Sequence, residues 1–325
     1  MDATPKTKSG QDVLIRPLEE GDLQAADHIT RLAFGTFLGL PEPATFMGDT
    51  KYVHTRWRAN PDAAFCAEID GELVGSNFVS DWGSVGFFGP LTTHPKMWDR
   101  GVAKLLIEPA IECFEGWGTR QAGLMTFAES IKHVNLYQKF GFYPRFLTAI
   151  MSKAVDAHAD DKGVHWTKFS DVPVDKRTEM VETCRELTDS VFEGLDLRRE
   201  ILSVASQHLG DTVLLWEGSK LAGLAVCHCG AGSEAGSGIC YIKFAAVNSG
   251  SGAAERYADI ITACETLAAQ KGLQKLTGGA NTARQEAYDL MFGLGFKTNR
   301  QTVVMHRPND SGYNRPGVFI IDDWR

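Results

Sequence analysis

A short loop ahead of a predicted helix carries residue types that could bind a phosphate group. Residues 91–93 are apolar or β-branched, as in a buried strand, and the loop of residues 96–101 that follows them ends in Gly101. Free amide groups and the positive end of the helix dipole make such a helix start an anion site. Gly101 and Ala103 are small enough for a pyrophosphate to approach the backbone, and Arg100 adds positive charge. An ordinary strand-to-helix connection has the same spacing, so the loop alone does not decide between the two.

The elements that would position this loop follow from the spacing of apolar residues. Apolar side chains recur on one helical face over residues 102–117, and Gly118 is placed to end that helix. Residues 119–128 then predict a strand. Residues 131–140 predict a short helix, for which Ser130 is available as the N-cap.

The first part of the chain supplies the rest of a sheet. Two strands, at residues 64–69 and 73–80, flank Asp70-Gly71, which is a strong signal for a tight hairpin turn. The other elements predicted before the loop are strands at 13–17 and 85–91 and helices at 19–37 and 52–60. This order predicts a mixed α/β sheet, preceded by a frayed tail of about ten residues.

Two motifs, in this order, resemble those of the GNAT N-acetyltransferases, a family that binds acetyl-coenzyme A. That family carries an Arg/Gln-x-x-Gly-x-Gly/Ala loop after a strand and, further along, a helix ending in Leu-Tyr-x-Lys-x-Gly-Phe. Here residues 98–103 read Trp-Asp-Arg-Gly-Val-Ala, and residues 136–142 read Leu-Tyr-Gln-Lys-Phe-Gly-Phe. Two positions depart from the pattern: Trp98 replaces the usual Arg or Gln, and Ser130 stands where many members have Asn. Backbone amides do most of the phosphate binding, so the first change removes one polar contact without removing the turn.

The resemblance implies an acetyl-CoA site and the residues that form it. As in the family, a backbone N–H on the strand of residues 91–93 would polarise the thioester carbonyl. The set implied for the cofactor is Leu91, Thr92, Thr93, Trp98, Asp99, Arg100, Gly101, Val102, Ala103, Lys104 and Ser130. No pattern of Cys, His or acidic residues predicts a metal site.

Acyl transfer to an amine needs a neutral nucleophile, donors for the oxyanion and a proton for the leaving thiolate. The resemblance implies that Tyr137 gives this proton; the alternative is a buried aromatic residue with a hydrogen-bonded hydroxyl. No convincing general base stands out among Asp81, His94, Glu129 and His133. His133 lies one helical turn before Tyr137, so both face the same side, and a water chain could replace a side-chain base. The catalytic candidates are therefore Tyr137, His133 and Glu129.

Composition and charge argue against several classes of protein. The 325-residue chain is 43% hydrophobic and 23% charged, as soluble globular proteins are, and its apolar runs are too short to span a bilayer. A net charge of −8 argues against nucleic acid and against anionic membranes as partners. Seven scattered cysteines and an N-terminus without an apolar leader segment predict a cytoplasmic location.

The pattern of the first half repeats in the second half. An offset of 154 positions pairs Gly118 with Gly272, Gly141 with Gly295, Phe142 with Phe296, Thr148 with Thr302 and Met151 with Met305. Internal duplication explains these pairs better than chance. We therefore predict two tandem GNAT domains, residues 1–154 and 155–325, joined by a polar linker at 153–163. The expected fold class is α/β (α+β), and each domain is a mixed, mostly antiparallel sheet flanked by helices.

The second domain is predicted to be degenerate. The same offset places Gly252 on Trp98, Glu255 on Gly101, Tyr257 on Ala103 and Met291 on Tyr137. A carboxylate and a bulky ring at the turn would oppose a pyrophosphate. The last residues, 312–325, predict a docked terminal strand, but the sequence does not say where it docks.

We interpret the chain as an acetyl-CoA-dependent N-acetyltransferase that moves an acetyl group to a primary amine of a small molecule or peptide by direct attack. One alternative is a non-catalytic CoA-binding sensor or interaction protein. Another is an acyltransferase that uses a longer acyl-CoA. The predicted partners are the amine acceptor and a second copy of the chain, which would form a homodimer. Neither nucleic acid nor a membrane is expected as a partner.

Overall fold

The computed structural model describes residues 5–8, 10–159 and 163–325. Contacts divide the chain into two compact units, residues 1–81 with 86–119 and residues 82–85 with 120–325. The predicted linker at 153–163 lies partly outside the described residues, because 160–162 are not among them.

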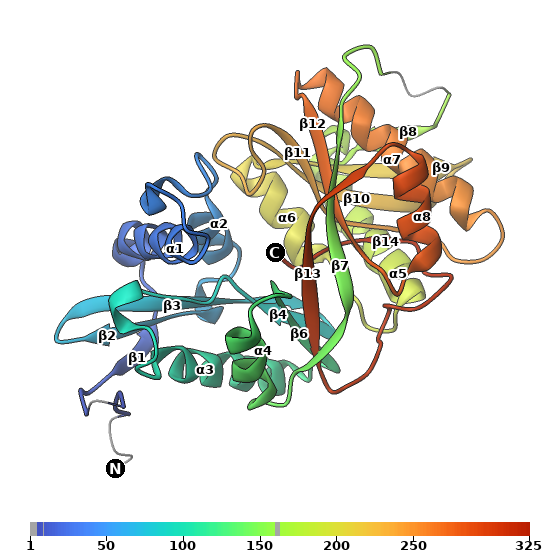
Figure 1. The fold of residues 1–325 in the computed structure, drawn as a ribbon. Coiled ribbons are helices and arrows are strands. Elements are labelled where there is room, and N and C mark those ends of the chain that lie inside the picture. The colour runs from blue at the N-terminus through green and yellow to red at the C-terminus, as the bar shows by residue number, and fades with distance from the viewer. Residues whose placement is uncertain (1–4, 9, 160–162) are drawn as a thin grey trace. The chain divides into compact units, whose positions relative to one another are not determined.

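The first unit is a sheet with three helices (Figure 1). Its elements are β1 (Leu14–Pro17), α1 (Leu23–Phe37), α2 (Tyr52–Ala59), β2 (Ala64–Ile69), β3 (Glu72–Trp82), β4 (Val85–Phe88), β5 (Thr92–Thr93) and α3 (Val102–Trp117). The strand order is β1-β2-β3-β4, and β5 also pairs with β3. The predicted hairpin turn is present, and both Asp70 (φ 52°) and Gly71 (φ 81°) are left-handed there, as a tight turn between right-twisted strands requires.

The second unit holds the remaining elements. These are β6 (Gln121–Phe127), α4 (Ile131–Gln138), β7 (Tyr143–Ala154), β8 (Trp166–Lys168), α5 (Arg177–Val191), α6 (Arg198–Gln207), β9 (Gly210–Glu217), β10 (Lys220–Gly230), β11 (Gly236–Val247), α7 (Ala253–Gln270), β12 (Lys275–Asn281), α8 (Gln285–Gly293), β13 (Lys297–Arg307) and β14 (Ile320–Ile321). The strand order is β6-β13-β7-β12-β11-β10-β9-β8, and β14 pairs with β11. Neighbours in this order are antiparallel except β11 and β12, which are parallel. The predicted fold class, a mixed and mostly antiparallel sheet flanked by helices, is confirmed.

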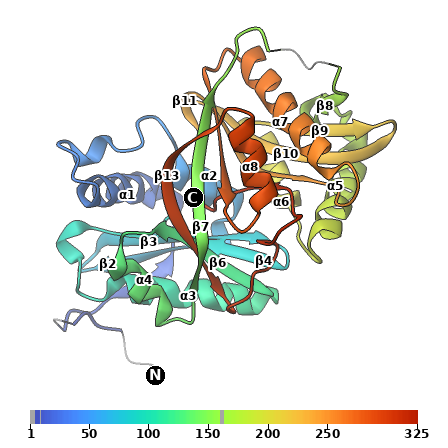
Figure 2. The same cartoon turned by 45° about the vertical axis from the view of Figure 1, so that its right-hand side comes forward.

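The two long strands β7 and β13 lie side by side, between β6 and β12 in this order (Figures 1 and 2). Each pairs on its other edge with a strand from the opposite half of the sequence: Thr302 of β13 lies opposite Phe127 of β6, and Thr148 of β7 lies opposite Asn281 of β12. Both pairs are related by the offset of 154 seen in the sequence. The two halves have therefore exchanged their last strands with matching registers.

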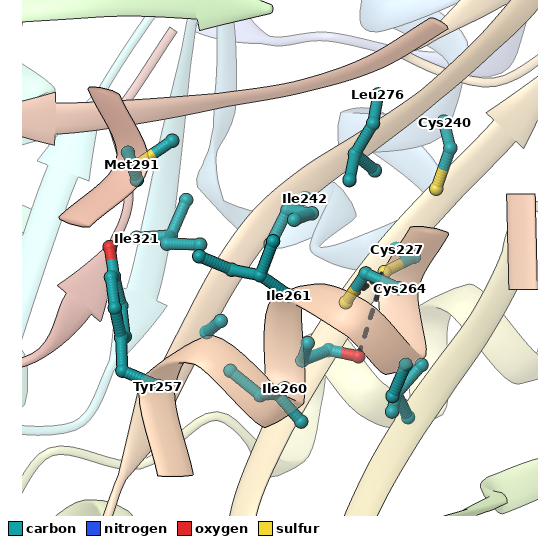
Figure 3. Packing of buried hydrophobic residues seen from close by; sticks show 14 of the residues in the cluster. Cys227, Cys240, Ile242, Tyr257, Ile260, Ile261, Cys264, Leu276, Met291 and Ile321 are labelled. Atoms are coloured by element: carbon teal, nitrogen blue, oxygen red, sulfur yellow. Dashed lines mark hydrogen bonds between the residues drawn. The ribbon is translucent and has the colours of Figure 1, made fainter. Parts of the chain in front are cut away.

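The apolar interior of the second unit gathers around α7. Its buried side chains include Ile260, Ile261 and Cys264, and the helix packs against β9, β10 and β11. Figure 3 shows these side chains together with Ile242 of β11 and Leu276 of β12. Burial of side chains of this size stabilises the fold by about 1.5–3 kcal/mol each.

The offset of 154 does not hold at the turns that precede the long helices. Both α3 and α7 begin after a left-handed glycine, Gly101 (φ 94°) in the first case and Gly252 (φ 79°) in the second. Gly252 therefore corresponds to Gly101 and not to Trp98. The reason is a shorter connection: α7 follows its strand β11 after fewer residues than α3 follows β5.

The expectation that Glu255 and Tyr257 stand at the turn of the second half is therefore wrong. The residue that matches Ala103 in the structure is Ala254, which is also small. Tyr257 lies further into α7, is fully buried, and has its ring centroid 5.4 Å from that of Phe319.

The expectation of a frayed N-terminus is wrong for the described part of the tail. Lys6 forms an isolated β-bridge and a 3.3 Å ion pair with Asp12, and the amide of Lys8 donates to the carbonyl oxygen of Arg100 at 2.9 Å. Residues 1–4 and 9 lie outside the described residues. The tail is thus fastened to the loop that the sequence singled out.

The position of β7 between β13 and β12 predicts a large loss of stability when its core side chain is shortened. Met151 is fully buried in the main cluster of the second unit, so Met151→Ala should lower the free energy of unfolding by about 2–5 kcal/mol in a urea titration. Thr298→Ala, at an exposed position opposite Met151 on β13, should change it by no more than about 0.5 kcal/mol. Equal losses in the two variants would contradict the packing described.

Candidate functional site

Strand β5 is held against β3 by a close backbone approach. Thr93 lies opposite Gly75, Thr92 lies opposite Ser76, and the amide of the next residue, His94, donates to Val74 at 2.8 Å. A Cβ atom on Gly75 would lie 2.7 Å from the carbonyl oxygen of Thr92. Glycine at this position therefore permits the pairing that fixes β5.

The register decides which backbone groups of β5 are turned away from the sheet. In an antiparallel pair the amides of alternate residues point to the same side. Since His94 and Thr92 face β3, Leu91 and Thr93 point their amides to the other edge. The carbonyl oxygen of Thr93 on that edge accepts a 3.1 Å hydrogen bond from Nε1 of Trp98. The sequence interpretation missed this role of Trp98, which ties the loop to the strand.

The loop turns into α3 through two left-handed residues, Asp99 (φ 65°) and Gly101 (φ 94°). Gly101 is the N-cap of α3, and its carbonyl oxygen already accepts from Lys104 at 3.1 Å, while the first amides of a helix have no partner inside it. A Cβ atom on Gly101 would meet only the Cγ of Lys8, at 3.9 Å, among the described residues. The space beside Cα of Gly101 is thus open, and a left-handed glycine turn at a helix start suits a phosphate group.

The start of α3 is fixed from behind by burial. Val102 and Leu106 are 1% and 0% exposed and pack with Ile69 and Val74 of β2 and β3. Amides that are held in place by a buried helix lose little entropy when an anion binds.

Besides the exposed Lys96 at its start, the loop has the cations Arg100, Lys104 and Lys8 on it or next to it. Arg100 is exposed, and its Nη1 donates to Oε1 of Gln11 at 3.1 Å. Lys104 is half-buried on the first turn of α3. Lys8, which the sequence interpretation assigned to a frayed tail, is held beside Arg100 and Gly101. The sequence feature that could have predicted this position of Lys8 is the spacing from Lys6 to Asp12, which suits a small hairpin.

The other predicted residues lie on and before α4, in the second unit. Tyr137 is 8% exposed on this helix, and His133 is half-buried one turn earlier. Ser130 was expected to cap the helix, but its side chain makes no cap bond; its Oγ lies 2.8 Å from Nδ1 of His133 instead. Glu129 is exposed.

Burial sets the protonation of the two candidate proton carriers. Burial raises the pKa of the Tyr137 hydroxyl well above its ordinary value, so this group stays protonated at neutral pH and can act as an acid. Burial, helped by the charge of Lys132, lowers the pKa of His133, so its imidazole is neutral at pH 7 and can accept a proton. Burial also lowers the pKa of His94, whose Nδ1 accepts a 3.1 Å hydrogen bond from the amide of Lys96.

The structure thus sorts the predicted residues into two groups. The strand and loop residues from Leu91 to Lys104 form one continuous group in the first unit. Ser130, His133 and Tyr137 form a second group in the second unit, and Glu129 belongs to it by position only. Among the described residues no group of three or more His, Cys, Asp or Glu side chains could hold a metal ion, and none of their helices is long and apolar enough to cross a membrane.

Residues 31–142 match the family model of the acetyltransferase (GNAT) family. Among the curated proteins compared, none matches the chain.

Solved structures resemble the whole chain. A putative acetyltransferase from Pyrococcus horikoshii has a TM-score of 0.66 at 13% identity, with 96% of this chain and 95% of that chain covered. A GCN5-related N-acetyltransferase from Sphaerobacter thermophilus has a TM-score of 0.58 at 14% identity, with 91% and 95% covered. Another from Anabaena variabilis has a TM-score of 0.53 at 13% identity, with 93% and 74% covered. At these identities the likeness shows a shared fold.

The match to the GNAT family model is thus confined to residues 31–142, and the solved structures show that the whole chain shares their fold.

The geometry of the turn predicts that Gly101→Glu removes most of the affinity for acetyl-CoA. A non-glycine residue is strained at a φ of 94°, and a carboxylate would repel phosphate, so we expect binding about 10- to 100-fold weaker by isothermal titration calorimetry. Gly116→Glu makes the same change at the far end of α3, where a Cβ atom meets nothing within 4 Å. This control should bind as the wild type does, and equal losses in both variants would argue against a phosphate site at the turn.

Proposed function

We propose that the chain is an acetyl-CoA-dependent N-acetyltransferase that acts on a primary amine of a small molecule or peptide. The observation that carries the proposal is the open, left-handed glycine turn at the start of α3, next to a strand whose Leu91 and Thr93 amides face away from β3. Backbone donors at a helix start suit the pyrophosphate, and strand amides suit the amide groups and thioester carbonyl of the acyl carrier.

The proposed roles follow from the groups available. Acetyl-CoA, when bound, supplies the activated acyl group. The amides of Leu91 and Thr93 stabilise the oxyanion that develops on the carbonyl, because they are fixed donors that need no reorganisation. Neutral His133 takes a proton from the ammonium group of the acceptor, and the neutral amine then attacks the thioester carbonyl. Tyr137, protonated at neutral pH, gives its proton to the leaving sulfur as the C–S bond breaks. The charge of −8 favours a cationic acceptor such as an amine.

We further propose a tandem of two GNAT folds, residues 1–154 and 155–325, in the cytoplasm. The matching registers of the exchanged strands support the duplication. The second copy carries Met291 at the position of Tyr137 and so lacks the proposed acid.

A non-catalytic CoA-binding sensor is the second candidate. The observation that favours it is Trp98: its indole N–H is engaged by Thr93, so the position where the family usually offers Arg or Gln gives no polar contact to a phosphate. A longer acyl-CoA as donor would keep the same site residues and is tested by the same assays with other acyl chains.

Turnover separates the enzyme from the sensor. Tyr137→Phe should lower kcat with an amine acceptor by about 10²- to 10⁴-fold and leave acetyl-CoA binding unchanged, because only the proton donor is lost. Tyr143→Phe, at a tyrosine that is 48% exposed, serves as the matched control and should keep full activity. A wild-type protein that binds acetyl-CoA but shows no turnover with any amine tested would support the sensor.

The pH profile tests His133. A base acts only when neutral, so kcat/KM should rise with pH through a pKa below the ordinary 6.5 of histidine and gain nothing further from this group above it. His133→Gln should lose this acidic limb together with most of the activity at pH 7. A limb that persists in the variant would assign the titration to another group.

A further inference from the structure

The C-terminal segment of the chain lies between two strands of the second unit. Strands β11 and β12 pair in parallel through Ile239, Cys240 and Tyr241 of β11. Further along, β14 lies between them: Ile320 and Ile321 pair with β11, and the amide of Asp322 donates to Gly279 of β12 at 3.0 Å. The predicted terminal strand is therefore present, and its place is in the gap where β11 and β12 have separated.

The edge of β11 that β14 covers corresponds to the edge proposed for the cofactor in the first half. Thr93 lies opposite Gly75 in the first half, and Val247 lies opposite Gly223 in the second. Ala245 and Ala246, which pair with β14, therefore match Leu91 and Thr92. Both matches have the offset of 154.

Two glycines of β12 make room for the segment. A Cβ atom on Gly278 would lie 2.7 Å from Cγ2 of Ile321, and one on Gly279 would lie 2.2 Å from Cβ of Asp323. At the same offset the first half has Leu124 and Met125 on β6, which are not glycine. The second half thus differs from the first at the positions that admit the segment.

Side-chain contacts fasten the segment on both sides. Asp322 accepts from Arg284, whose Nη2 lies 2.6 Å from Oδ1, and also from the hydroxyl of Tyr313. Asp323 accepts from the hydroxyl of Tyr241 at 2.9 Å. Arg284 stands at the position of Ser130 in the repeat and is completely buried.

The apolar side chains of the segment fill the same interior. Phe319 lies against Tyr257 of α7, and Ile321 is fully buried (Figure 3). Tyr257, Met291 and Ile321 belong to one buried cluster and lie in the same part of Figure 3. Met291 occupies the place of the proposed acid Tyr137, so the segment reaches the point that would be the reacting end of a site.

Donors in this interior exceed the acceptors that the segment provides. The hydroxyl of Tyr257 and both Nε and Nη1 of Arg284 are buried without a hydrogen-bond partner among the described residues. Burial raises the pKa of the Tyr257 hydroxyl well above its ordinary value, so this group stays a protonated donor. A buried donor without a partner is costly, and a ligand richer in acceptors than a peptide would satisfy more of them.

We propose that residues 318–323 occupy a second acyl-CoA groove in the place of the pantetheine arm, so that the chain binds one acyl-CoA and displacing the segment opens a second site. This inference rests on the proposed function, which assigns the corresponding edge of the first half to the same ligand. A pantetheine arm carries two amide groups and can pair with a strand edge as a short peptide does. The left-handed Gly252 at the start of α7 supplies a turn for the phosphates.

The turn of the second site is covered by one side chain. The guanidinium of Arg256 donates to the carbonyl oxygens of Asn248 and Ser251 and to Glu217. A Cβ atom on Gly252 would lie 3.1 Å from Nη1 of Arg256. This cation lies where the phosphates would bind, and it becomes their partner once the groove is open.

The test counts binding sites by isothermal titration with acetyl-CoA. The wild type should bind one equivalent, and a chain that ends at Gly317 should bind two. In the Gly101→Glu background the full-length chain should show at least tenfold weaker binding than the truncated chain, which keeps only the second site. A synthetic peptide of residues 318–325 should displace acetyl-CoA from that truncated variant, and pantetheine alone should compete there as well.

The outcomes separate this inference from the proposed function. One site in both the wild type and a folded truncated chain overturns the inference and leaves the proposed function intact. No site in the wild type and one in the truncated chain overturns the proposed first site and supports the second. Two sites in the wild type also overturn the inference, because the segment then blocks nothing.

A point variant covers the case in which the truncated chain does not fold. Gly279→Ala forces the segment out of its place through the 2.2 Å approach, while Gly293→Ala, with nothing within 4 Å, is the matched control. In Gly279→Ala, the amides of residues 320–322 should exchange with deuterium at least tenfold faster, and a second site should appear in the titration. Faster exchange without a second site, or unchanged exchange, would each overturn the inference.

Discussion

Backbone pairing between β7 and β13 holds the second unit together. Residues 148–152 of β7 pair with both β12 and β13, and residues 302–306 of β13 pair with both β6 and β7, so each strand is covered on both edges over this stretch. At the centre, Thr302 donates from Oγ1 to the carbonyl oxygen of Thr148 at 3.0 Å, and Asn281 donates to Oγ1 of Thr148 at 3.0 Å. These three side chains are buried, and their hydrogen bonds join the two repeats at Thr148, which favours this register.

This exchange decides how a duplicated sequence becomes one structure. Strand β6 belongs to the first repeat and β13 to the second, yet they are partners, and the same holds for β12 and β7. If the two repeats did not exchange these strands and one repeat lost its last strand, an edge of its sheet would stay unpaired. The contacts consequently assign residues 120–154 to the same compact unit as the second repeat, although the sequence repeat places them in the first.

The two repeats differ in what lies along the same strand edge. In the first half the amides of Leu91 and Thr93 face away from β3, and the helix start beside them is open at Gly101. In the second half β14 lies along the matching edge of β11, and the glycines of β12 leave room for it. A peptide segment that is part of the chain competes at a high effective concentration, so it can hold a groove that a diffusing ligand would otherwise fill.

Much of the fold could be predicted from the sequence because the signals are local. Apolar periodicity with a terminal glycine gave α3, and the Asp70-Gly71 dipeptide gave the β2–β3 hairpin; both are properties of a few consecutive residues. The family motifs likewise placed the Gly101 turn. The offset of 154 predicted which elements would repeat, because a duplicated sequence keeps its spacing wherever no residue is lost.

Only the tertiary structure decided the remaining features of the fold and the site, because these features depend on contacts between residues distant in sequence. The offset could not reveal that the connection before α7 is shorter, so the match of Glu255 to Gly101 was wrong. Ser130 is the N-cap residue of α4, as predicted, but its side chain makes no cap bond and its hydroxyl contacts His133 instead. The roles of Lys8 and Trp98, the exchange of β7 and β13 and the place of β14 all come from pairings that no local pattern encodes. By itself the sequence determined most of the elements and carried the resemblance to a known family over residues 31–142, whereas packing determined which strand edges are covered.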